Sequence, residues 1–257
     1  MPEGDSVWFT AHRLDEALAG RVLTRTDFRV PRLATATLTG QQVTEVVPRG
    51  KHLLARTSGG LTVHTHLRMD GSWRVTPAAE RVPDNHRIRL ILANEDWQAT
   101  GYLLGVVELL RTSAEHRVTG HLGPDLLGPD WDADEAVRRL TEDKTRPIGE
   151  ALLDQQNLAG IGNVYKSEVL FLRGVNPWTP AGDVHDLAGL TEQARSLLDA
   201  NKDRTRRNTT GSTRPGEESW VYGRRGRACR RCGTAVRAQG QQDRVTYWCP
   251  RCQPQPA

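Results

Sequence analysis

The stretch Leu153-Asp-Gln-Gln-Asn-Leu-Ala-Gly-Ile-Gly-Asn-Val-Tyr-Lys-Ser-Glu168 sets the architecture of the second half of this 257-residue chain. Its Leu-Ala-Gly-Ile-Gly segment is typical of a tight turn, because glycine adopts backbone angles that other residues avoid. The residues after this turn predict a helix over Asn163–Arg173, and a proline in a first helical turn predicts a shorter helix over Pro147–Leu153. Further helices are predicted over residues 133–140 and 190–200.

An amphipathic helix is predicted at the N-terminus. Apolar residues recur at helical spacing between residues 7 and 18 and form one stripe, which predicts a helix over Asp5–Ala19. Asp5 or Ser6 is expected to cap its start. The first residues of the chain therefore lie just outside a helix N-terminus.

From residue 22 to about residue 110, short runs of Val, Leu, Ile and Thr alternate with Gly, Pro and Asn, which is typical of strands and turns. Strands are predicted over residues 42–47, 52–57, 61–66, 72–75, 87–92 and 101–110. Ser58-Gly59-Gly60 and Asp70-Gly71 are predicted to be hairpin turns. The pattern favours a two-layer β-sandwich.

Four parts follow from this pattern. We expect an N-terminal sandwich domain over residues 1–118, a turn-rich linker over 119–130, a helical domain over 131–220 and a cysteine module over 221–257. The fold class is therefore predicted to be α+β.

The charge is mildly basic overall, with a net charge of +4 and a pI of about 9.1. Residues 201–237 hold eleven Lys/Arg against three Asp/Glu, which suits phosphate binding but also a solvated loop. The polar part of this block, Asn201–Ser219, is expected to be mobile. The longest apolar stretch, Tyr102–Val107, is too short to cross a bilayer, and the acidic N-terminus does not resemble a secretory signal. A cytoplasmic protein without a membrane partner is expected.

The four cysteines form two Cys-x2-Cys pairs separated by 16 residues, and they are Cys229, Cys232, Cys249 and Cys252. This spacing places four thiolates around one tetrahedral zinc ion. The alternative is a pair of redox-active motifs, but neither pair begins a helix in a βαβ unit. Four cysteines leave no open coordination position, so the Zn2+ is predicted to be structural. Residues 234–236 and 244–248 are predicted to form a hairpin between the two pairs.

The N-terminal proline is a candidate nucleophile. Removal of Met1 leaves Pro2 with a free secondary amine, and an α-amine has a pKa near 8, below that of a lysine. The positive end of the following helix is expected to lower this pKa further. Such an amine can attack a sugar C1′ and form an imine, with Glu3 as the acid or base. Taken alone, Met-Pro is a common start with no catalytic meaning.

Four motifs occur here in a fixed order: Met1-Pro-Glu-Gly-Asp5, Arg49-Gly-Lys-His-Leu-Leu54, Leu153–Glu168 and the paired cysteines. In this combination the chain resembles the formamidopyrimidine-DNA glycosylase/endonuclease VIII family over essentially its whole length. The resemblance implies a helix and a two-layer antiparallel β-sandwich, followed by a helix-two-turn-helix domain with a C-terminal zinc-finger β-hairpin. It also implies a bifunctional DNA glycosylase/AP lyase of base excision repair that cuts the strand by β,δ-elimination.

The resemblance assigns a role to each matching residue. Pro2 resembles the Schiff-base nucleophile and Glu3 the proton donor. Lys51 resembles the hairpin lysine that contacts the phosphate beside the lesion and assists elimination. Asn163 resembles the phosphate-binding asparagine, and Arg244 resembles the zinc-finger arginine that binds the same phosphate region and supports the second elimination. These residues suit a phosphate-binding site. Lys51 and Arg244 are cations, and Asn163 begins a predicted helix, where backbone N–H groups attract an anion.

Two loops bear on the substrate. His66-Leu-Arg-Met-Asp-Gly71 resembles the void-filling loop, with Met69 as the wedge and Arg68 where the endonuclease VIII branch has a glutamine. The alternative for Met69 is a hairpin-tip or core methionine. Thr100-Gly-Tyr-Leu-Leu-Gly105 lacks the arginine and phenylalanine of the 8-oxoguanine-directed branch. We therefore favour the endonuclease VIII branch and oxidised pyrimidines, with an 8-oxoguanine/formamidopyrimidine-directed glycosylase as the alternative.

Some residues depart from the family pattern. Asp5-Ser6 replace the familiar Pro-Glu, and His121 stands where the family carries a phosphate-binding arginine. His64 and His66 alternate on a strand, which favours a structural or DNA-facing pair over a metal site.

Two other functions remain open from sequence: a non-catalytic damaged-DNA-binding protein on the same scaffold, and an N-terminal-proline enzyme such as a tautomerase. The expected partner is damaged double-stranded DNA, bound by a monomer in the bacterial cytoplasm or at the nucleoid.

Overall fold

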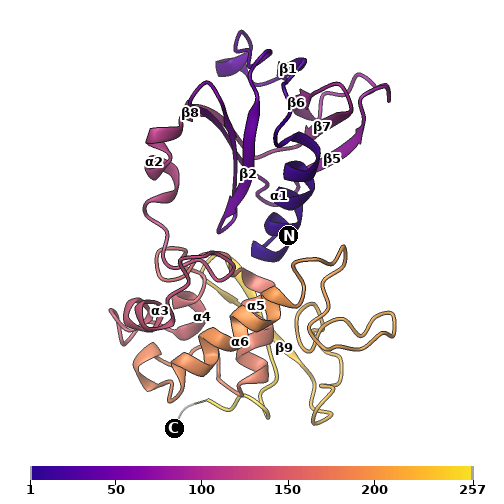
Figure 1. Ribbon diagram of the computed structural model, residues 1–257. Coiled ribbons are helices and arrows are strands. Elements are labelled where there is room, and N and C mark those ends of the chain that lie inside the picture. Colours follow the sequence, from indigo (N-terminus) through magenta and orange to yellow (C-terminus); the bar gives the residue numbers. More distant parts are fainter. Residues whose placement is uncertain (1, 256–257) are drawn as a thin grey trace. The chain divides into compact units, whose positions relative to one another are not determined.

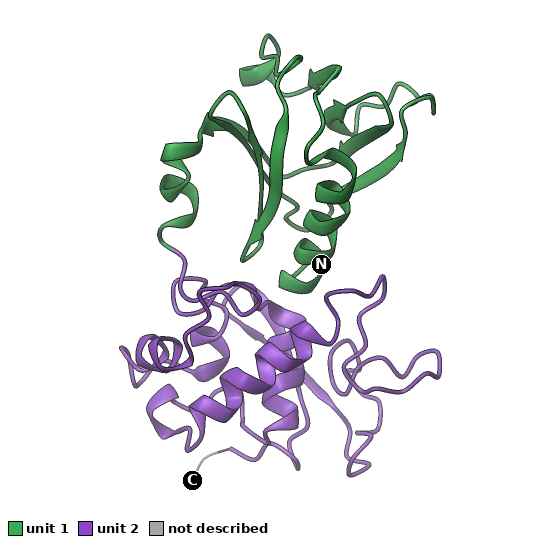
Figure 2. Cartoon of the chain, viewed as in Figure 1, with its two compact units in different colours: residues 1–121 green, residues 122–257 purple. Residues whose placement is uncertain are grey.

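The computed structural model describes residues 2–255 (Figure 1). The chain forms two compact units, Met1–His121 and Leu122–Ala257 (Figure 2). The predicted domain bounds at 118, 130 and 220 stay predictions. The segment expected to be a linker is packed in the second unit, where residues 122–126 are buried and Asp125 forms a β-bridge with Ala159.

Unit 1 begins with helix α1 (Gly4–Leu18), which confirms the predicted N-terminal helix. The predicted stripe is buried in the core of the unit, since Val7 and Leu18 are at most 1% exposed. The helix starts one residue earlier than expected. Its N-cap is Glu3, so the prediction that Asp5 or Ser6 caps the helix was wrong.

Two four-stranded antiparallel sheets follow α1. One has the order β1 (Arg25–Phe28), β6 (Ile88–Ala93), β7 (Trp97–Tyr102) and β5 (Ser72–Pro77). The other has the order β2 (Val43–Arg49), β3 (His52–Thr57), β4 (Leu61–His66) and β8 (Val106–Arg111). Both sheets bury apolar side chains in one core, Leu53 and Val63 from one and Leu90 and Leu92 from the other, so the two-layer sandwich is confirmed.

Two turn predictions had different outcomes. Ser58-Gly59-Gly60 joins the paired strands β3 and β4, as expected. Asp70-Gly71 is not a hairpin turn, because β4 and β5 lie in different sheets and the chain crosses between layers there. The single strand expected over residues 101–110 is two strands, and the break falls at Leu103, whose φ is +46°. A 3-10 turn, η1 (Pro31–Leu33), lies between β1 and β2. The unit ends with a second 3-10 turn, η2 (Thr112–Ala114), and helix α2 (His116–Thr119).

Unit 2 is a helical bundle with a β-hairpin. Its helices are α3 (Ala133–Leu140), α4 (Ile148–Ala151), α5 (Asn163–Leu172) and α6 (Leu187–Asp199), with a 3-10 turn η3 (Ala181–Asp183). The turn between α4 and α5 needs Gly160, whose φ is +100°. Nearly all of α5 is buried, because α4, α6 and the hairpin pack around it.

The hairpin pairs β9 (Arg237–Gln241) with β10 (Arg244–Trp248). The first strand was expected over residues 234–236, which was wrong by several residues, because Ala235 instead bridges back to Ala228. The expectation of a mobile Asn201–Ser219 segment was also wrong. Asn201 is 1% exposed and accepts a hydrogen bond from the backbone of Asn208, and Thr209 pairs with Glu218. None of the described helices is long and apolar enough to cross a membrane.

Candidate active site

The candidate nucleophile lies at the start of α1. Glu3 is fully buried at 0% exposure, and its backbone carbonyl accepts the N–H of Val7 at 3.0 Å, which closes the first helical turn. Pro2 comes immediately before it and is half-buried. The residue that follows the secondary amine therefore carries a buried carboxyl group. This is the pairing that nucleophilic attack with proton transfer requires.

The departure at Asp5-Ser6 is accommodated inside the helix. Asp5 is 4% exposed and accepts a hydrogen bond from the Ser6 hydroxyl at 3.2 Å. A carboxylate in the first turn is favoured by the positive end of the helix dipole. Asp5 therefore keeps an acidic group in the first turn of α1, one position earlier than the familiar glutamate.

Lys51 occupies the two-residue turn between β2 and β3. Gly50 supplies the positive φ of +57° that this kind of tight turn needs at its first position. The turn is closed by the cross-strand pair of Arg49 and His52. The sheet therefore holds Lys51 at the tip of a short, rigid hairpin.

The candidate wedge loop connects β4 to β5. Arg68 adopts a left-handed φ of +55°, and its backbone N–H donates to Nδ1 of His66 at 2.9 Å. The Arg68 side chain packs so closely on Gly105 that a Cβ there would lie 2.1 Å from its Cγ. Met69 is 50% exposed, so it is not a core methionine. Its role as a wedge stays a prediction.

The region that lacks the 8-oxoguanine-branch residues is compact. Thr100 is 2% exposed within β7, and Leu104 is 6% exposed in the core. Only Leu103–Gly105 connects β7 to β8. This three-residue connection between β7 and β8 is too short to form an extended loop that contacts a base.

One face of the β2-β3-β4-β8 sheet carries a histidine cluster that the sequence did not predict. Nδ1 of His52 lies 2.8 Å from Nε2 of His64, and Nδ1 of His64 lies 2.9 Å from Oε2 of Glu108. The His52 ring also meets the rings of His66 and His121, with centroids 5.0 Å and 6.3 Å apart. The alternation of His64 and His66 signalled a shared face, but no sequence signal linked them to His52 or Glu108.

Burial keeps two of these imidazoles neutral. Burial, together with the charges of the neighbouring histidines and Arg68, lowers the pKa of His52 to about 3. Burial, with the charges of Arg68 and Lys51, lowers the pKa of His66 to about 4. The electrostatic effect of Lys51 and Arg68 on His66 indicates that all three belong to one cationic end of unit 1.

In unit 2 the structure brings Asn163 and the tip of the β9–β10 hairpin together. The Asn163 side-chain amide donates to the backbone carbonyl of Val245 at 2.8 Å, while its Oδ1 is buried without a hydrogen-bond partner. Arg244 lies next to Val245, and its side chain is 38% exposed and within 3.5 Å of Asp243. The first residue of α5 and Arg244 therefore share one region of this unit.

A buried carboxylate on α5 anchors the segment before the cysteines. Glu168 is fully buried and accepts backbone N–H groups from Trp220, Val221 and Tyr222 at 2.7 to 2.9 Å. It also accepts the Thr209 hydroxyl. A buried charge needs such donors. This role could not be predicted from the sequence, because the backbone partners lie about fifty positions away from Glu168.

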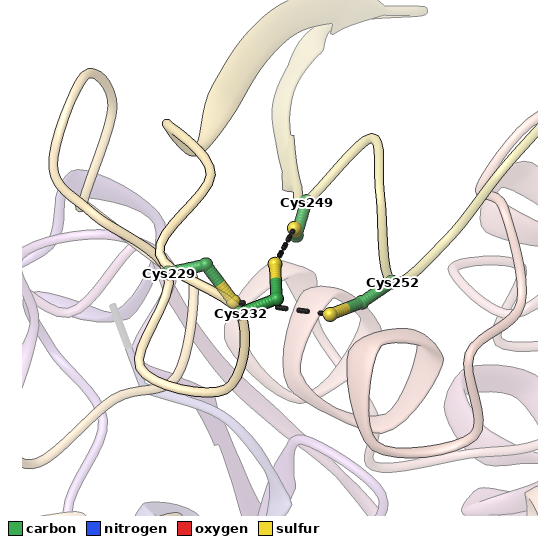
Figure 3. A group of neighbouring side chains, drawn as sticks. All are labelled: Cys229, Cys232, Cys249 and Cys252. Atoms are coloured by element: carbon green, nitrogen blue, oxygen red, sulfur yellow. Dashed lines mark hydrogen bonds between the residues drawn. The ribbon is translucent and has the colours of Figure 1, made fainter.

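The four cysteines form the metal site (Figure 3). Their sulfur atoms all lie within 4.8 Å of one another, with 3.4 Å between Cys232 and Cys249 and 4.0 Å between Cys229 and Cys252. Four sulfurs at about 2.3 Å from one zinc ion lie about 3.8 Å apart, so the set fits tetrahedral zinc. Among the described residues, these four form the one cluster of metal-ligating side chains close enough to share an ion.

The thiol environments differ within this set. Hydrogen bonds from Thr234 lower the pKa of Cys232 to about 6, whereas burial raises the pKa of Cys249 and of Cys252. Zn2+ supplies the positive charge that holds all four as thiolates. The site takes one structural zinc ion.

Three family models match the chain. The formamidopyrimidine-DNA glycosylase N-terminal domain matches residues 1–101, and the H2TH domain of the same glycosylases matches residues 122–205. A zinc finger found in FPG and IleRS matches residues 226–255. These matches confirm the predicted helix-two-turn-helix domain and the zinc finger.

Known proteins agree with these matches. The probable endonuclease 8 2 of Streptomyces coelicolor is 58% identical over 265 residues, which cover 100% of this chain and 95% of that protein. The DNA-(apurinic or apyrimidinic site) lyase Nei2 of Mycolicibacterium smegmatis is 48% identical, with 98% of this chain and 99% of that protein covered.

Solved structures show the same fold. The formamidopyrimidine-DNA glycosylase of Lactococcus lactis, bound to DNA with an abasic site, superposes with a TM-score of 0.82 at 25% identity, covering 98% of this chain and 100% of that one. Its complex with DNA that contains an oxidised pyrimidine superposes with a TM-score of 0.84, also at 25% identity, over 99% of this chain and 100% of that one. This chain therefore belongs to the formamidopyrimidine-DNA glycosylase/endonuclease VIII family, and within it to the endonuclease 8 branch.

Proposed function

We propose that this protein, a DNA glycosylase and AP lyase of base excision repair, uses the amine of Pro2 as its nucleophile. The observation that carries the proposal is the full burial of Glu3, the N-cap residue of α1, which follows Pro2 in the sequence. Burying an ionisable group is costly, so the burial of Glu3 favours a part in the chemistry over DNA binding alone.

The chemistry follows from these two groups. The Pro2 nitrogen forms a bond to C1′ of the flipped nucleotide as the glycosidic bond breaks, and Glu3 exchanges the proton that this step requires. Breaking the C1′–O4′ bond, with a proton transferred to O4′, then converts this adduct into an iminium, which withdraws electrons and makes the C2′ hydrogen acidic. Its loss breaks the bond from C3′ to the phosphate oxygen, and a second elimination breaks the C5′ bond.

Phosphate binding is assigned to residues of both units. Lys51 at its hairpin tip and Arg244 on β10 are cations that neutralise phosphate charge. Asn163 lies at the start of α5, where unpaired backbone N–H groups also attract an anion. Met69 and Arg68 fill the space that the flipped nucleotide leaves, a role supported by the 50% exposure of Met69.

The substrate is an oxidised pyrimidine in duplex DNA. The short, buried connection between β7 and β8 supports this choice over 8-oxoguanine, since Leu103–Gly105 offers neither an arginine nor an aromatic side chain. The protein acts as a monomer in the bacterial cytoplasm, where its DNA substrate lies.

Borohydride trapping tests the proposal. The tag-free protein is incubated with a duplex that carries 5-hydroxyuracil, and in parallel with duplexes carrying an abasic site or 8-oxoguanine. A covalent adduct on the first two that disappears in Pro2→Gly supports the proposal. Binding without an adduct on any of these duplexes would leave a non-catalytic damaged-DNA-binding protein. A stronger reaction with 8-oxoguanine would reverse the substrate assignment alone.

A further inference from the structure

A chain of three hydrogen-bonded side chains crosses the β2-β3-β4-β8 sheet, and the proposed chemistry does not use it. His52 on β3, His64 on β4 and Glu108 on β8 are joined by contacts of 2.8 Å and 2.9 Å. The middle residue is 4% exposed, whereas the Glu108 side chain is 53% exposed. The hydrogen-bonded chain therefore links solvent at Glu108, through buried His64, to the half-buried His52.

The positions of the hydrogens in this hydrogen-bonded chain are set by Glu108, the acceptor at its exposed end. A carboxylate only accepts, so Nδ1 of His64 donates to Glu108. In neutral His64 the other nitrogen, Nε2, is an acceptor, and Nδ1 of His52 must donate to it. Nε2 of His52 is then left without a hydrogen. The geometry sets the tautomer of His52, as a carboxylate does for a catalytic imidazole.

Adding one proton reverses this arrangement. A new N–H bond forms at Nε2 of His52, the Nδ1–H bond of His52 breaks, and its proton forms an N–H bond at Nε2 of His64. His52 stays neutral throughout, and the positive charge is on His64, beside the Glu108 carboxylate. This explains how a histidine whose own pKa is lowered to about 3 can still accept a proton.

Other charged groups surround the inner end of the chain. Glu115, which binds Arg56 and Thr62, acts on His64 from the segment between η2 and α2. The groups that act electrostatically on His52 and its neighbour His66 are Lys51 from the β2–β3 turn, Arg68 from the wedge loop, and His121. The cations oppose a charge on His52 itself, so an accepted proton is stable only at the Glu108 end.

We propose that His52, His64 and Glu108 form a proton relay that accepts the proton removed during strand cleavage. The proposal rests on the proposed lyase function, because elimination releases one proton for each C–O bond broken. The cationic end that carries Lys51 and Arg68 is where that function binds phosphate, and His52 lies at the same end. His52 takes the proton directly or through one water, and His64 and Glu108 are positioning residues.

Nitrogen-15 NMR of the imidazole rings in the DNA-free protein tests the relay without reference to activity. At neutral pH the relay requires a hydrogen on Nδ1 of His52 and none on Nε2. On acidification Nε2 of His64 gains a hydrogen, so that both of its nitrogens carry one, and the hydrogen of His52 moves to Nε2 in the same pH step. A hydrogen on Nε2 of His52 at neutral pH, or a tautomer that does not change with His64, overturns the proposal.

Single-turnover cleavage of an abasic duplex supplies the second test. Glu108→Gln keeps the shape but removes the charge that stabilises the loaded relay, and we expect strand cleavage to slow by about tenfold. Borohydride trapping should stay at the wild-type level, since it reports the step at Pro2. Glu45→Gln is the matched control, because Glu45 lies on the same sheet, is similarly exposed at 47%, and pairs with Arg56.

The outcomes separate the two proposals. Slowed cleavage with normal trapping in Glu108→Gln, and also in His64→Gln, supports the relay. Wild-type cleavage in both variants at every pH overturns it. A wild-type protein that never traps overturns the proposed lyase function instead, and the NMR result then decides whether the hydrogen-bonded chain transfers a proton as described.

Discussion

Asn163, the first residue of α5, donates its side-chain amide to the backbone carbonyl of Val245 on β10 at 2.8 Å. One hydrogen bond thus ties the helix of the helix-two-turn-helix motif to the hairpin held by the four cysteines. The neighbouring residue, Arg244, depends on that hairpin for its position. The zinc site and the proposed phosphate site are therefore mechanically connected within unit 2.

Removing zinc should leave the β9–β10 hairpin without its fixed conformation, while unit 1 stays folded. Structural zinc binds zinc-finger peptides with about 10 kcal/mol or more, and part of that energy here fixes β9 and β10. We expect chelation to lower the melting temperature and to weaken duplex binding by at least about tenfold, because Arg244 loses its fixed position. Calorimetry and fluorescence anisotropy measure both effects, and added zinc should restore them. Unchanged DNA affinity in metal-free protein would contradict this connection.

Arg244→Gln should remove one phosphate contact. The salt dependence of duplex binding should fall by about one unit of slope, with affinity reduced for all sequences alike. The ratio of δ- to β-elimination products should also fall, because the second elimination needs this cation. Arg237→Gln is a suitable control, since Arg237 lies at the opposite end of the same hairpin, paired with Trp248. Equal salt slopes in the two variants would argue against a phosphate contact at Arg244.

Met69→Ala should separate base excision from strand cleavage. Because Met69 is 50% exposed, its truncation should leave the free energy of unfolding nearly unchanged. Excision of 5-hydroxyuracil should slow by roughly tenfold, equivalent to about 1.4 kcal/mol of lost stabilisation of the flipped nucleotide. Cleavage at a preformed abasic site should fall less, since there is no base to expel. Parallel single-turnover assays measure both rates; equal losses would exclude a wedge role.

Acid should destabilise unit 1 through its buried histidines. The folded pKa values of His52 and His66 are about 3 and about 4, below the ordinary value of 6.5. The unfolded chain therefore binds protons that the folded chain does not, so this stability is present above pH 6.5 and is lost as the pH falls toward 4. Each group contributes at most about 1.4 kcal/mol per pH unit.

Urea unfolding of wild type and His66→Gln, at about pH 7 and about pH 5, measures this effect. The loss of stability between the two pH values should be smaller in His66→Gln. His86→Gln, which changes an exposed histidine, should behave as wild type. An identical loss in all three proteins would show that carboxylates, and not His66, control acid unfolding.

Local periodicity predicted several elements at their observed bounds, including β3, β4, α3 and β10. These elements have strong alternation or helical spacing, so local sequence sufficed. The Asp70-Gly71 prediction failed for a different reason. A turn dipeptide marks where a strand ends, but it does not encode which layer the next strand joins. The break at Leu103 had no signal, because a left-handed backbone is unusual for leucine.

The candidate site shows the same limit. The cysteine spacing predicted a cluster that the structure contains. Contacts such as those of His64 with Glu108 and of Glu168 with Tyr222 join residues 44 and 54 positions apart. A single sequence carries no period or motif that pairs such residues. For the same reason the hydrogen bonds that order residues 201–219 could not be foreseen from their polar composition.

The identity of the nucleophile is most directly tested by mapping the trapped adduct. Wild-type protein is reduced with borohydride on an abasic duplex, the DNA is digested, and the protein is cleaved with trypsin for mass spectrometry. The sugar adduct should lie on the N-terminal peptide Pro2–Arg13, at the nitrogen of Pro2. An adduct on the peptide that contains Lys51, or on any other lysine, would contradict the central claim.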